Sequence, residues 1–473
     1  MNELILKSAS ELATLISKKD VSSREVVEAH LNRIQEVNPE INAITIVLED
    51  SAMSMAEAAD KASEDLRKRP FHGVPITVKE NIDYVGVPTT NGLKLLEDSY
   101  PTKNAPIIDR MLESGAIPIG RTNLPELGLR LDTDNPLRGR TFNPWNKKLT
   151  PGGSSGGEAA AIASGMSPFG LGNDIGGSLR NPAYCCGIAS LKPSVGRIPA
   201  VRTIEGFQDR GIAGEFYAEG PMARSVEDLK NGLLIMAGRH VDDPRSISVE
   251  FNGYVPENPK AAIVKSLPNH EIAKANVEAI EKAAKILEDK GWIIEEVDAP
   301  EVDHVYNIWL KVLNSGMLDA IPENTFQPKT EAYLHRFAEQ SHNDPLTLYE
   351  ALVERDRLRR VWSSFLDNYQ VCIGPTWANR PWPIDTDLDP DIGVPTLRES
   401  FNFITPGNCL GIPSVSLPMD VVDSHPSGIQ IYSGLYREDL CLSAAEIIQK
   451  LNTITIVLVI LLAMNAYSFM RKR

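Results

Sequence analysis

The most restrictive feature of this 473-residue sequence is a glycine-rich stretch over residues 152–199 that contains two serine-bearing loops. The first loop is GGSSGG at 152–157, directly before the helix-prone segment EAAAIA, and the second is GNDIGGSLR at 172–180. Glycine permits positive φ and close backbone approach, so each loop can direct several consecutive N–H groups toward one point. Such N–H groups stabilise an anion, for example the oxyanion of an acyl-transfer intermediate. The stretch therefore predicts a site that handles a developing negative charge.

A serine nucleophile needs a base, and the histidines are poorly placed to provide one. The eight histidines are scattered, and only His72 lies near a candidate motif. A lysine acts as a base when it is neutral, and burial can lower the lysine pKa far enough. The two candidates are Lys79, which follows the apolar segment GVPITV, and Lys192 in LKPS. Spacing alone does not choose between them.

Other catalytic and nucleotide-binding motifs fit the sequence poorly. GSSGG at 153–157 matches G-x-S-x-G with Ser155 as nucleophile, but the preceding NPWNKKLTPG is not the apolar strand that a nucleophile elbow requires. GLGNDIGG at 170–177 lacks the third glycine of G-x-G-x-x-G, and no G-K-[ST] sequence occurs. No H-E-x-x-H or other paired ligand motif is present. The sequence therefore predicts neither a metal site nor a cofactor.

Charge and cysteine content narrow the classes of partner and the compartment. Lys and Arg number 48 against 63 Asp and Glu, a net charge of −15. This balance argues against nucleic acid as a partner, because phosphate backbones are bound by clustered Lys and Arg. The five cysteines include no C-x-x-C pair, and the N-terminus has no apolar run of signal-peptide length. We therefore expect no disulfide framework, no zinc site and a cytoplasmic location.

The C-terminal end carries a candidate membrane anchor. Residues 451–470 contain no charged side chain, and Arg471, Lys472 and Arg473 follow them. Twenty uncharged residues can just span a bilayer as a helix. A membrane-anchoring tail and a buried terminal helix or strand both remain open. The sequence thus predicts a catalytic domain over 1–449 and an apolar tail over 450–473.

Helix and strand patterns alternate along the chain, which predicts an α/β protein. Ser8 with Glu11, and Ser22 with Glu25, fit capping boxes that begin the first two helices. A third helix is expected over residues 53–68. Further expected elements are strands at 73–78, 116–120 and 292–297, helices at 107–114 and 274–290, and a substructure capping a site over 299–370.

At these motifs the sequence resembles the amidase signature family of serine hydrolases. The resemblance extends over about residues 5–447 and is most specific within 150–199. It implies an α/β fold with a large twisted mixed β-sheet flanked by helices on both faces. The blocks that carry it are GVPITVKEN (73–81), RTNLPEL (121–127), GGSSGGEAAA (152–161), GNDIGGSLRNPA (172–183), LKPSVGRIP (191–199), GPMARSVEDL (220–229) and NCLGIPSVSLP (408–418).

The resemblance also implies a Ser–cis-Ser–Lys triad. Matched by motif, Ser178 is the nucleophile, Ser154 after a cis peptide bond is the bridging serine, and Lys79 is the base. Asn173 stands where many family members carry Thr or Ser. The oxyanion would be held by the backbone N–H groups of Ile175, Gly176, Gly177 and Ser178, and the supporting positions are Ser155, Asp174 and Arg180.

The implied reaction is hydrolysis of a carboxylic amide to an acid plus ammonia or an amine, through an acyl-enzyme and without a cofactor. Two alternatives stay open. The amidase subunit of a glutamyl-tRNA amidotransferase has the same triad, although NLPELGL and DIGGS depart from the sequences usual in that subunit. A catalytically inactive amidase-like membrane receptor is the other, although all three triad residues are present. The expected partners are a small-molecule amide, a membrane through residues 451–470, and a second copy of the chain in a homodimer.

Overall fold

The computed structural model describes residues 2–204, 211–315, 321, 324–341 and 344–452. A mixed β-sheet of eleven strands crosses this part of the chain. In spatial order its strands are β1 (Ile44–Val47), β3 (Ile117–Thr122), β2 (Pro75–Lys79), β6 (Phe169–Asp174), β8 (Ala218–Ala223), β7 (Ala189–Lys192), β12 (Ser414–Val422), β13 (His425–Tyr432), β11 (Val371–Pro375), β9 (Lys260–Ile263) and β10 (Ile293–Glu296). The short strands β4 (Asp134–Asn135) and β5 (Gly139–Arg140) pair separately.

Parallel pairing in one part of the sheet determines where the site forms. β3, β2 and β6 are parallel neighbours, whereas β6, β8, β7, β12, β13 and β11 pair antiparallel in turn. Carboxyl ends of parallel strands lie at the same edge of a sheet. The last residue of β2, Lys79, therefore lies next to the end of β6 at Asn173 and Asp174, because Val78 is in register with Leu171.

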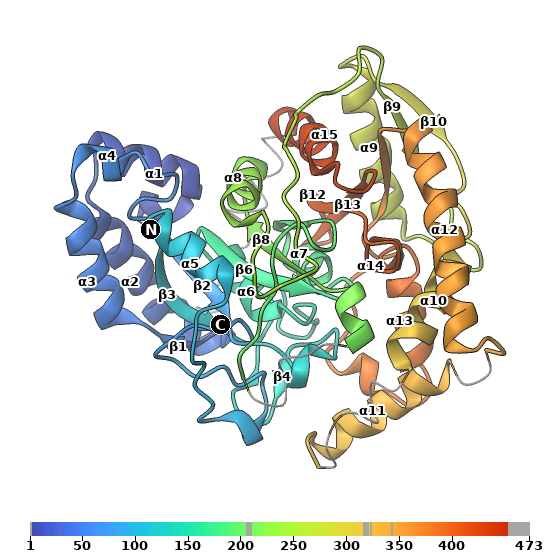
Figure 1. Ribbon diagram of the computed structural model, residues 1–473, viewed down its shortest axis with the longest axis horizontal. Helices are drawn as coiled ribbons and strands as arrows, with labels where there is room; N and C mark the ends of the chain where they lie inside the picture. Colours follow the sequence, from blue (N-terminus) through green and yellow to red (C-terminus); the bar gives the residue numbers. More distant parts are fainter. Residues whose placement is uncertain (1, 205–210, 316–320, 322–323, 342–343, 453–473) are drawn as a thin grey trace.

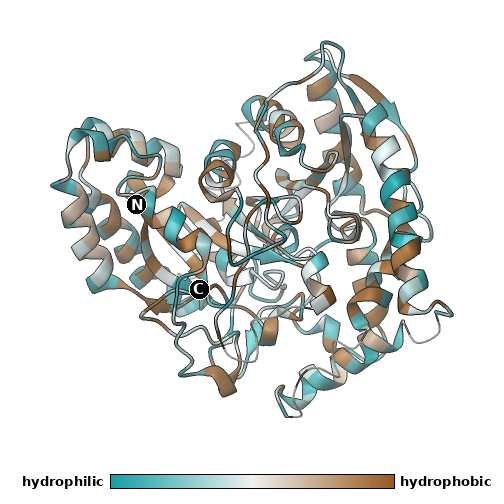
Figure 2. Cartoon of the chain, viewed as in Figure 1, coloured by the Kyte–Doolittle hydropathy of each residue, from teal (hydrophilic) through white to brown (hydrophobic). Residues whose placement is uncertain are grey.

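Helices cover both faces of the sheet (Figure 1), as the sequence predicts. One face packs against α1 (Ala9–Lys18), α5 (Pro106–Glu113), α8 (Val226–Met236), α9 (Lys274–Glu288) and α15 (Glu438–Leu451). On the other face α2 (Ser23–Ile41), α3 (Glu49–Asp60), α6 (Gly156–Ala163) and α7 (Arg180–Cys186) pack against the sheet. The hydrophobic cluster on that side also includes residues of α10 (Val302–Asn314), α11 (Pro328–Glu339), α12 (Leu348–Asn368), α13 (Gly393–Phe401) and α14 (Thr405–Cys409). At the edge of the molecule, α12 carries long hydrophilic stretches (Figure 2).

Most of the predicted helices and helix starts coincide with helices in the structure. Both predicted capping boxes form, at the starts of α1 and α2. The expected single helix over 53–68 is wrong, because α3 ends at Asp60 and a short α4 (Glu64–Arg67) follows. Ser63 separates the two helices in extended backbone conformation, with φ −62° and ψ 161°. Serine favours that conformation immediately before a helix.

The predicted C-terminal tail lies largely beyond the part of the chain that the structure describes. α15 ends at Leu451, and residues 453–473 are outside the described residues. Within the described ranges, no helix is both long enough and apolar enough to cross a bilayer.

Candidate active site

The first glycine-rich loop meets the end of β2. The Nζ of Lys79 donates hydrogen bonds to the Oγ of Ser154 and to the Oδ1 of Asn173, both at 2.8 Å. Lys79 is fully buried, and the two partners are nearly so. The peptide bond between Gly153 and Ser154 is cis. The strand-end lysine and the serine of the first loop thus form one hydrogen-bonded pair.

The protonation of Lys79 decides whether this pair can act as a base. Burial lowers the pKa of Lys79 to about 7, since desolvation disfavours the ammonium form. The Glu219 carboxylate acts in the opposite direction and raises this pKa, and the Arg202 guanidinium lowers it. A lysine with this pKa is neutral in a large fraction of molecules at pH 7, so its Nζ can accept a proton.

Lys192, the other lysine candidate, lies in a different environment. It is also fully buried, and burial lowers its pKa to about 7. Its Nζ donates to the carbonyl oxygen of Pro193 at 2.8 Å, and within the described ranges it bonds to neither glycine-rich loop. The geometry therefore favours Lys79 over Lys192 as the base.

The serines of the two loops lie in different places. Ser178 lines a cavity, and its carbonyl oxygen accepts a hydrogen bond from the N–H of Ser155 at 3.3 Å, which joins the loops. Among the residues described, the hydroxyls of Ser154 and Ser178 do not bond to each other. Ser155 is fully buried, does not line the cavity, and donates its hydroxyl to the Asn173 carbonyl oxygen at 3.5 Å. Ser178 is therefore the serine placed to meet a substrate.

The turn between β6 and α7 presents backbone N–H groups beside Ser178. Those of Ile175, Gly176 and Ser178 have no acceptor among the described residues. The N–H of Gly177, which the family resemblance also implied for the oxyanion, already donates to the Oδ1 of Asp174 at 2.7 Å. Three N–H groups rather than four are thus available to an oxyanion.

Asp174 and Arg180 brace this turn. The Asp174 carboxylate also accepts the N–H of Leu179 at 3.1 Å and pairs with the Nε of Arg180 at 3.1 Å. Burial by itself raises the pKa of Asp174, but the Arg180 guanidinium, together with Lys192 and the hydrogen bond from Asn408, holds that pKa well below its usual range. Arg180 also donates to the Ile404 carbonyl oxygen and to the Oδ1 of Asn408, both at 2.7 Å. Removing one partner would leave the other as an unpaired buried charge.

Glu158, which the sequence analysis did not select, lies behind Lys79. It occupies the first turn of α6 and accepts hydrogen bonds from the hydroxyls of Thr77, on β2, and Thr122, on β3. Burial raises its pKa to about 7. The sequence signal that could have identified Glu158 is its position as a carboxylate directly after GGSSGG. The residue ties the helix that follows Ser154 to the strand that carries Lys79.

The cavity beside Ser178 has mainly apolar and aromatic walls. The rings of Trp309 and Phe401 are 5.2 Å apart, and Tyr333 stacks on Phe337 at 6.1 Å between centroids. The predicted capping substructure over 299–370 supplies one side through α10 and α11. The complete lining is Gly128, Leu129, Arg130, Leu131, Ile175, Gly176, Ser178, Trp309, Leu313, Tyr333, Leu334, Phe337 and Phe401. No sequence motif identified the residues of these helices.

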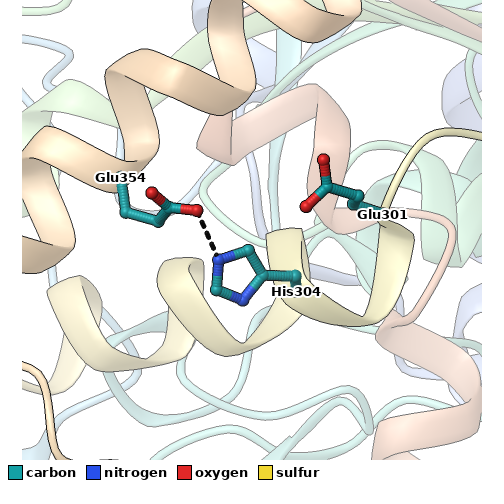
Figure 3. A group of neighbouring side chains, drawn as sticks. All are labelled: Glu301, His304 and Glu354. Atoms are coloured by element: carbon teal, nitrogen blue, oxygen red, sulfur yellow. Dashed lines mark hydrogen bonds and ion pairs between the residues drawn. The ribbon is translucent and has the colours of Figure 1, made fainter.

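Two groups in the described part of the chain have donor atoms close enough for a metal ion. They are Glu301, His304 and Glu354 (Figure 3), and Asp132, Asp385 and Asp387. In the first, Arg357 pairs with Glu301 at 2.6 Å and Glu354 at 2.7 Å. In the second, Arg130 pairs with Asp387 at 2.8 Å. A guanidinium thus already compensates the carboxylates in each group, and we interpret both as ion-pair networks.

Gly177 offers a direct test of the turn. Its φ is +99°, and a Cβ would lie 2.6 Å from the Cδ1 of Ile404 and 2.7 Å from the Nδ2 of Asn181. Gly177→Ala therefore strains the positive-φ backbone of the turn and displaces the Ile404 and Asn181 side chains that pack on it. We expect kcat/KM to fall by about 10²–10³, the effect of one lost oxyanion donor. Steady-state kinetics on a model amide measure this.

The matched control is Gly86→Ala. Gly86 has a similar φ of +91° but open space around it. The substitution should therefore add backbone strain, lower the Tm and leave kcat/KM at the wild-type value. Wild-type kcat/KM in Gly177→Ala would contradict the proposed importance of this turn.

Comparisons with known proteins give a consistent result. The family model described as Amidase matches residues 25–442. Indoleacetamide hydrolase of Bradyrhizobium diazoefficiens is 36% identical over 458 residues, which cover 94% of this chain and 86% of that protein. One of the subunits of glutamyl-tRNA(Gln) amidotransferase from Caldanaerobacter subterraneus is 27% identical over 481 residues, covering 95% of this chain and 97% of that one. The crystal structure of a bacterial aryl acylamidase of the amidase signature family, 25% identical, superimposes with a TM-score of 0.80 over 97% of this chain and 98% of that chain.

Proposed function

Because the chain belongs to the amidase signature family and is an amidase, we propose that it hydrolyses its substrate through an acyl-enzyme on Ser178. One observation carries the proposal: the buried Nζ of Lys79 bonds to the Oγ of Ser154 at 2.8 Å, next to the cavity that Ser178 lines. A neutral lysine in contact with a hydroxyl is the arrangement that removes a proton from a serine nucleophile. The full chemical assignment rests on this contact and on the motif match.

The proposed steps begin with two linked proton transfers along three side chains. Neutral Lys79 takes the proton of the Ser154 hydroxyl, and Ser154 takes that of Ser178 as its Oγ attacks the amide carbonyl carbon. The N–H groups of Ile175, Gly176 and Ser178 stabilise the oxyanion. Ser154 then gives a proton to the leaving nitrogen and recovers one from the Lys79 ammonium, and the C–N bond breaks. Water, deprotonated by the same pair, attacks the acyl ester, which releases the acid and restores the Ser178 hydroxyl. The Ser154–Ser178 hydrogen bond forms when substrate binds, as catalytic contacts often tighten only in the complex.

We also propose that the substrate carries an apolar aromatic group. The cavity walls of Trp309, Tyr333, Phe337 and Phe401 favour a flat ring, because offset and edge-to-face contacts stabilise aromatic pairs. Burying about 100 Å² of apolar surface contributes roughly 2.5 kcal/mol, which is about 70-fold in affinity. The relative named indoleacetamide hydrolase supports an arylacetamide as the first substrate to test.

The amidotransferase subunit is the main alternative, and relatives with that name exist. Its substrate glutamine carries a charged α-amino group and an α-carboxylate, which need polar partners. Arg130 is the charged residue in the cavity lining. Its Nε and Nη2 donate to Asp387 and Asp385, whereas its Nη1 has no hydrogen-bond partner among the described residues. The apolar walls therefore favour an aromatic amide over glutamine.

A panel of primary amides tests this function. We expect ammonia release from indole-3-acetamide and phenylacetamide with kcat/KM about 10²-fold above that for acetamide, and less activity with glutamine. Ser178→Ala supplies the background rate. Preferential hydrolysis of glutamine would instead support the amidotransferase function, and no hydrolysis of any amide would contradict the proposal.

We further propose that residues 1–449 form one catalytic domain. A single sheet takes strands from Ile44 to Tyr432, and α1 and α15 from the two ends of this range pack on the same face. Elements from both ends of this range therefore share one hydrophobic core, which does not separate into two domains. Limited proteolysis that released a stable internal fragment would contradict a single domain.

A further inference from the structure

Trp309 connects the wall of the cavity to the turn that presents the N–H groups. It lies in α10, its side chain is 1% exposed, and its ring lines the cavity. Its indole Nε1–H donates a hydrogen bond to the carbonyl oxygen of Ile175 at 3.1 Å. A side chain that lines the cavity therefore also holds one peptide group of the turn.

The held peptide group is the one that contains the Gly176 N–H. The carbonyl of Ile175 and the N–H of Gly176 share one planar trans peptide, in which the two groups point in opposite directions. Fixing the carbonyl therefore fixes the direction of the N–H. A hydrogen bond to the carbonyl oxygen also polarises the peptide, which strengthens its N–H as a donor. This N–H has no acceptor among the described residues, so it is available to a substrate oxyanion.

The ring itself is held firmly against the turn. A Cβ at Gly176 would lie 2.7 Å from the Cζ2 of Trp309 and 3.2 Å from the Cε1 of Phe401, so glycine permits the close contact. Phe401, Phe337 and Tyr306 surround the indole at centroid distances of 5.2, 6.2 and 6.2 Å. An indole fixed on several sides can define the orientation of the peptide it bonds.

We propose that Trp309 is a positioning residue that couples binding of an aromatic substrate group to alignment of the Gly176 N–H with the oxyanion. The inference rests on the proposed acyl-enzyme function. A ring that packs on the indole restrains it and thereby restrains the Ile175–Gly176 peptide. Binding of the remote aromatic group then helps to stabilise the transition state, because it keeps the Gly176 N–H aligned with the oxyanion. It therefore raises kcat as well as substrate affinity.

Trp309→Phe tests the proposal because it keeps an aromatic wall and removes the N–H. We expect kcat for phenylacetamide to fall about 10–100-fold, less than the 10²–10³-fold loss of a complete oxyanion donor. KM should change less than about threefold, and the pH dependence should stay as in the wild type, because Lys79 is unaffected. A variant with 3-benzothienylalanine at position 309 keeps the indole shape without the N–H and should show the same loss of kcat.

Trp362→Phe is the matched control. Trp362 is also buried, and its Nε1–H donates to the carbonyl oxygen of Pro300 at 2.9 Å, but it does not line the cavity. The control loses the same kind of hydrogen bond and should retain kcat even if its Tm falls. Wild-type kcat in both variants at position 309, or equal losses of kcat at positions 309 and 362, would overturn the proposal.

A second readout separates this inference from the proposed function. Phenylacetaldehyde can add to Ser178 and form a hemiacetal oxyanion, whereas phenylacetate binds without one. The Trp309 variants should bind the aldehyde about 10–100-fold more weakly and phenylacetate nearly unchanged. If the wild-type enzyme hydrolysed phenylacetamide without forming an acyl ester on Ser178, the acyl-enzyme assignment would be wrong. An enzyme that acts through Ser178, with unchanged aldehyde binding in the variants, would overturn the role of Trp309 alone.

Discussion

Ser178→Ala is expected to lower kcat for amide hydrolysis by about 10⁵–10⁶-fold, because removal of a serine nucleophile abolishes the acyl-enzyme route. Ser178 lines the cavity, and a hydroxyl-to-hydrogen change there leaves no charge unpaired. The Tm should therefore remain close to that of the wild type. Covalent labelling with a fluorophosphonate probe, followed by peptide mapping, should place the label on Ser178 and find none in the variant.

The contrasting substitution is Ser155→Ala. Ser155 is fully buried at the start of α6 and is the nucleophile only if the loop were a nucleophile elbow. This variant should lose less than about tenfold in kcat, the scale of one weak buried hydrogen bond, and should keep the label on Ser178. A label on Ser155, together with activity in Ser178→Ala, would reverse the two roles.

Lys79→Met is expected to lower kcat/KM by about 10³–10⁴-fold and to change the pH dependence of what remains. Lys79 acts only when neutral, and burial places its pKa at about 7. Wild-type kcat/KM should therefore rise about tenfold per pH unit below pH 7 and level off above it. We call this rise of kcat/KM below pH 7 the acidic limb. Measured pH–rate profiles should show that the residual activity of Lys79→Met lacks it.

Among the residues that the structure describes, two other buried groups have a pKa of about 7 and serve as controls. Lys192→Met and Glu158→Gln each remove one of them, and neither group contacts the Ser154 hydroxyl. The acidic limb should persist in both variants. Glu158 does contribute to the charge around Lys79, as do Glu219, Arg202 and Asp174, so Glu158→Gln should move the limb to lower pH. Loss of the limb in Lys192→Met alone would identify Lys192 as the base.

The sequence predicts the class of fold correctly, and it places the residues proposed for the chemistry in short motifs, because both depend on local signals. The capping boxes at Ser8 and Ser22 and the apolar strand that ends at Lys79 are each determined by residues that are close in the sequence. The two glycine-rich loops are equally compact motifs. What they cannot show is the engagement of the Gly177 N–H by Asp174, which depends on how one turn closes.

The cavity walls could not be predicted in the same way. Trp309, Tyr333, Phe337 and Phe401 come from α10, α11 and α13, and their spacing is that of ordinary amphipathic helices. A buried tryptophan on such a helix is indistinguishable in sequence from a core residue. Only tertiary packing against Gly176 and Ile175 reveals that the Trp309 ring meets the turn.

The parallel neighbours β2 and β6 have a consequence for how this scaffold can diverge. Lys79, the proposed base, ends β2, and the turn that carries Ser178, the proposed nucleophile, follows β6. The main chains that carry them are therefore held at the inter-strand spacing of about 4.8 Å. Main-chain hydrogen bonds keep that spacing whatever side chains the outer helices carry. Exchange of residues on α10, α11 and α13 other than Trp309 is therefore expected to alter which molecule is accepted without moving the proposed reactive atoms. The proposed reactive groups lie on strands and the turns that follow them, whereas the cavity walls come largely from separate helices. Trp309 is a point at which these two parts of the chain are in contact.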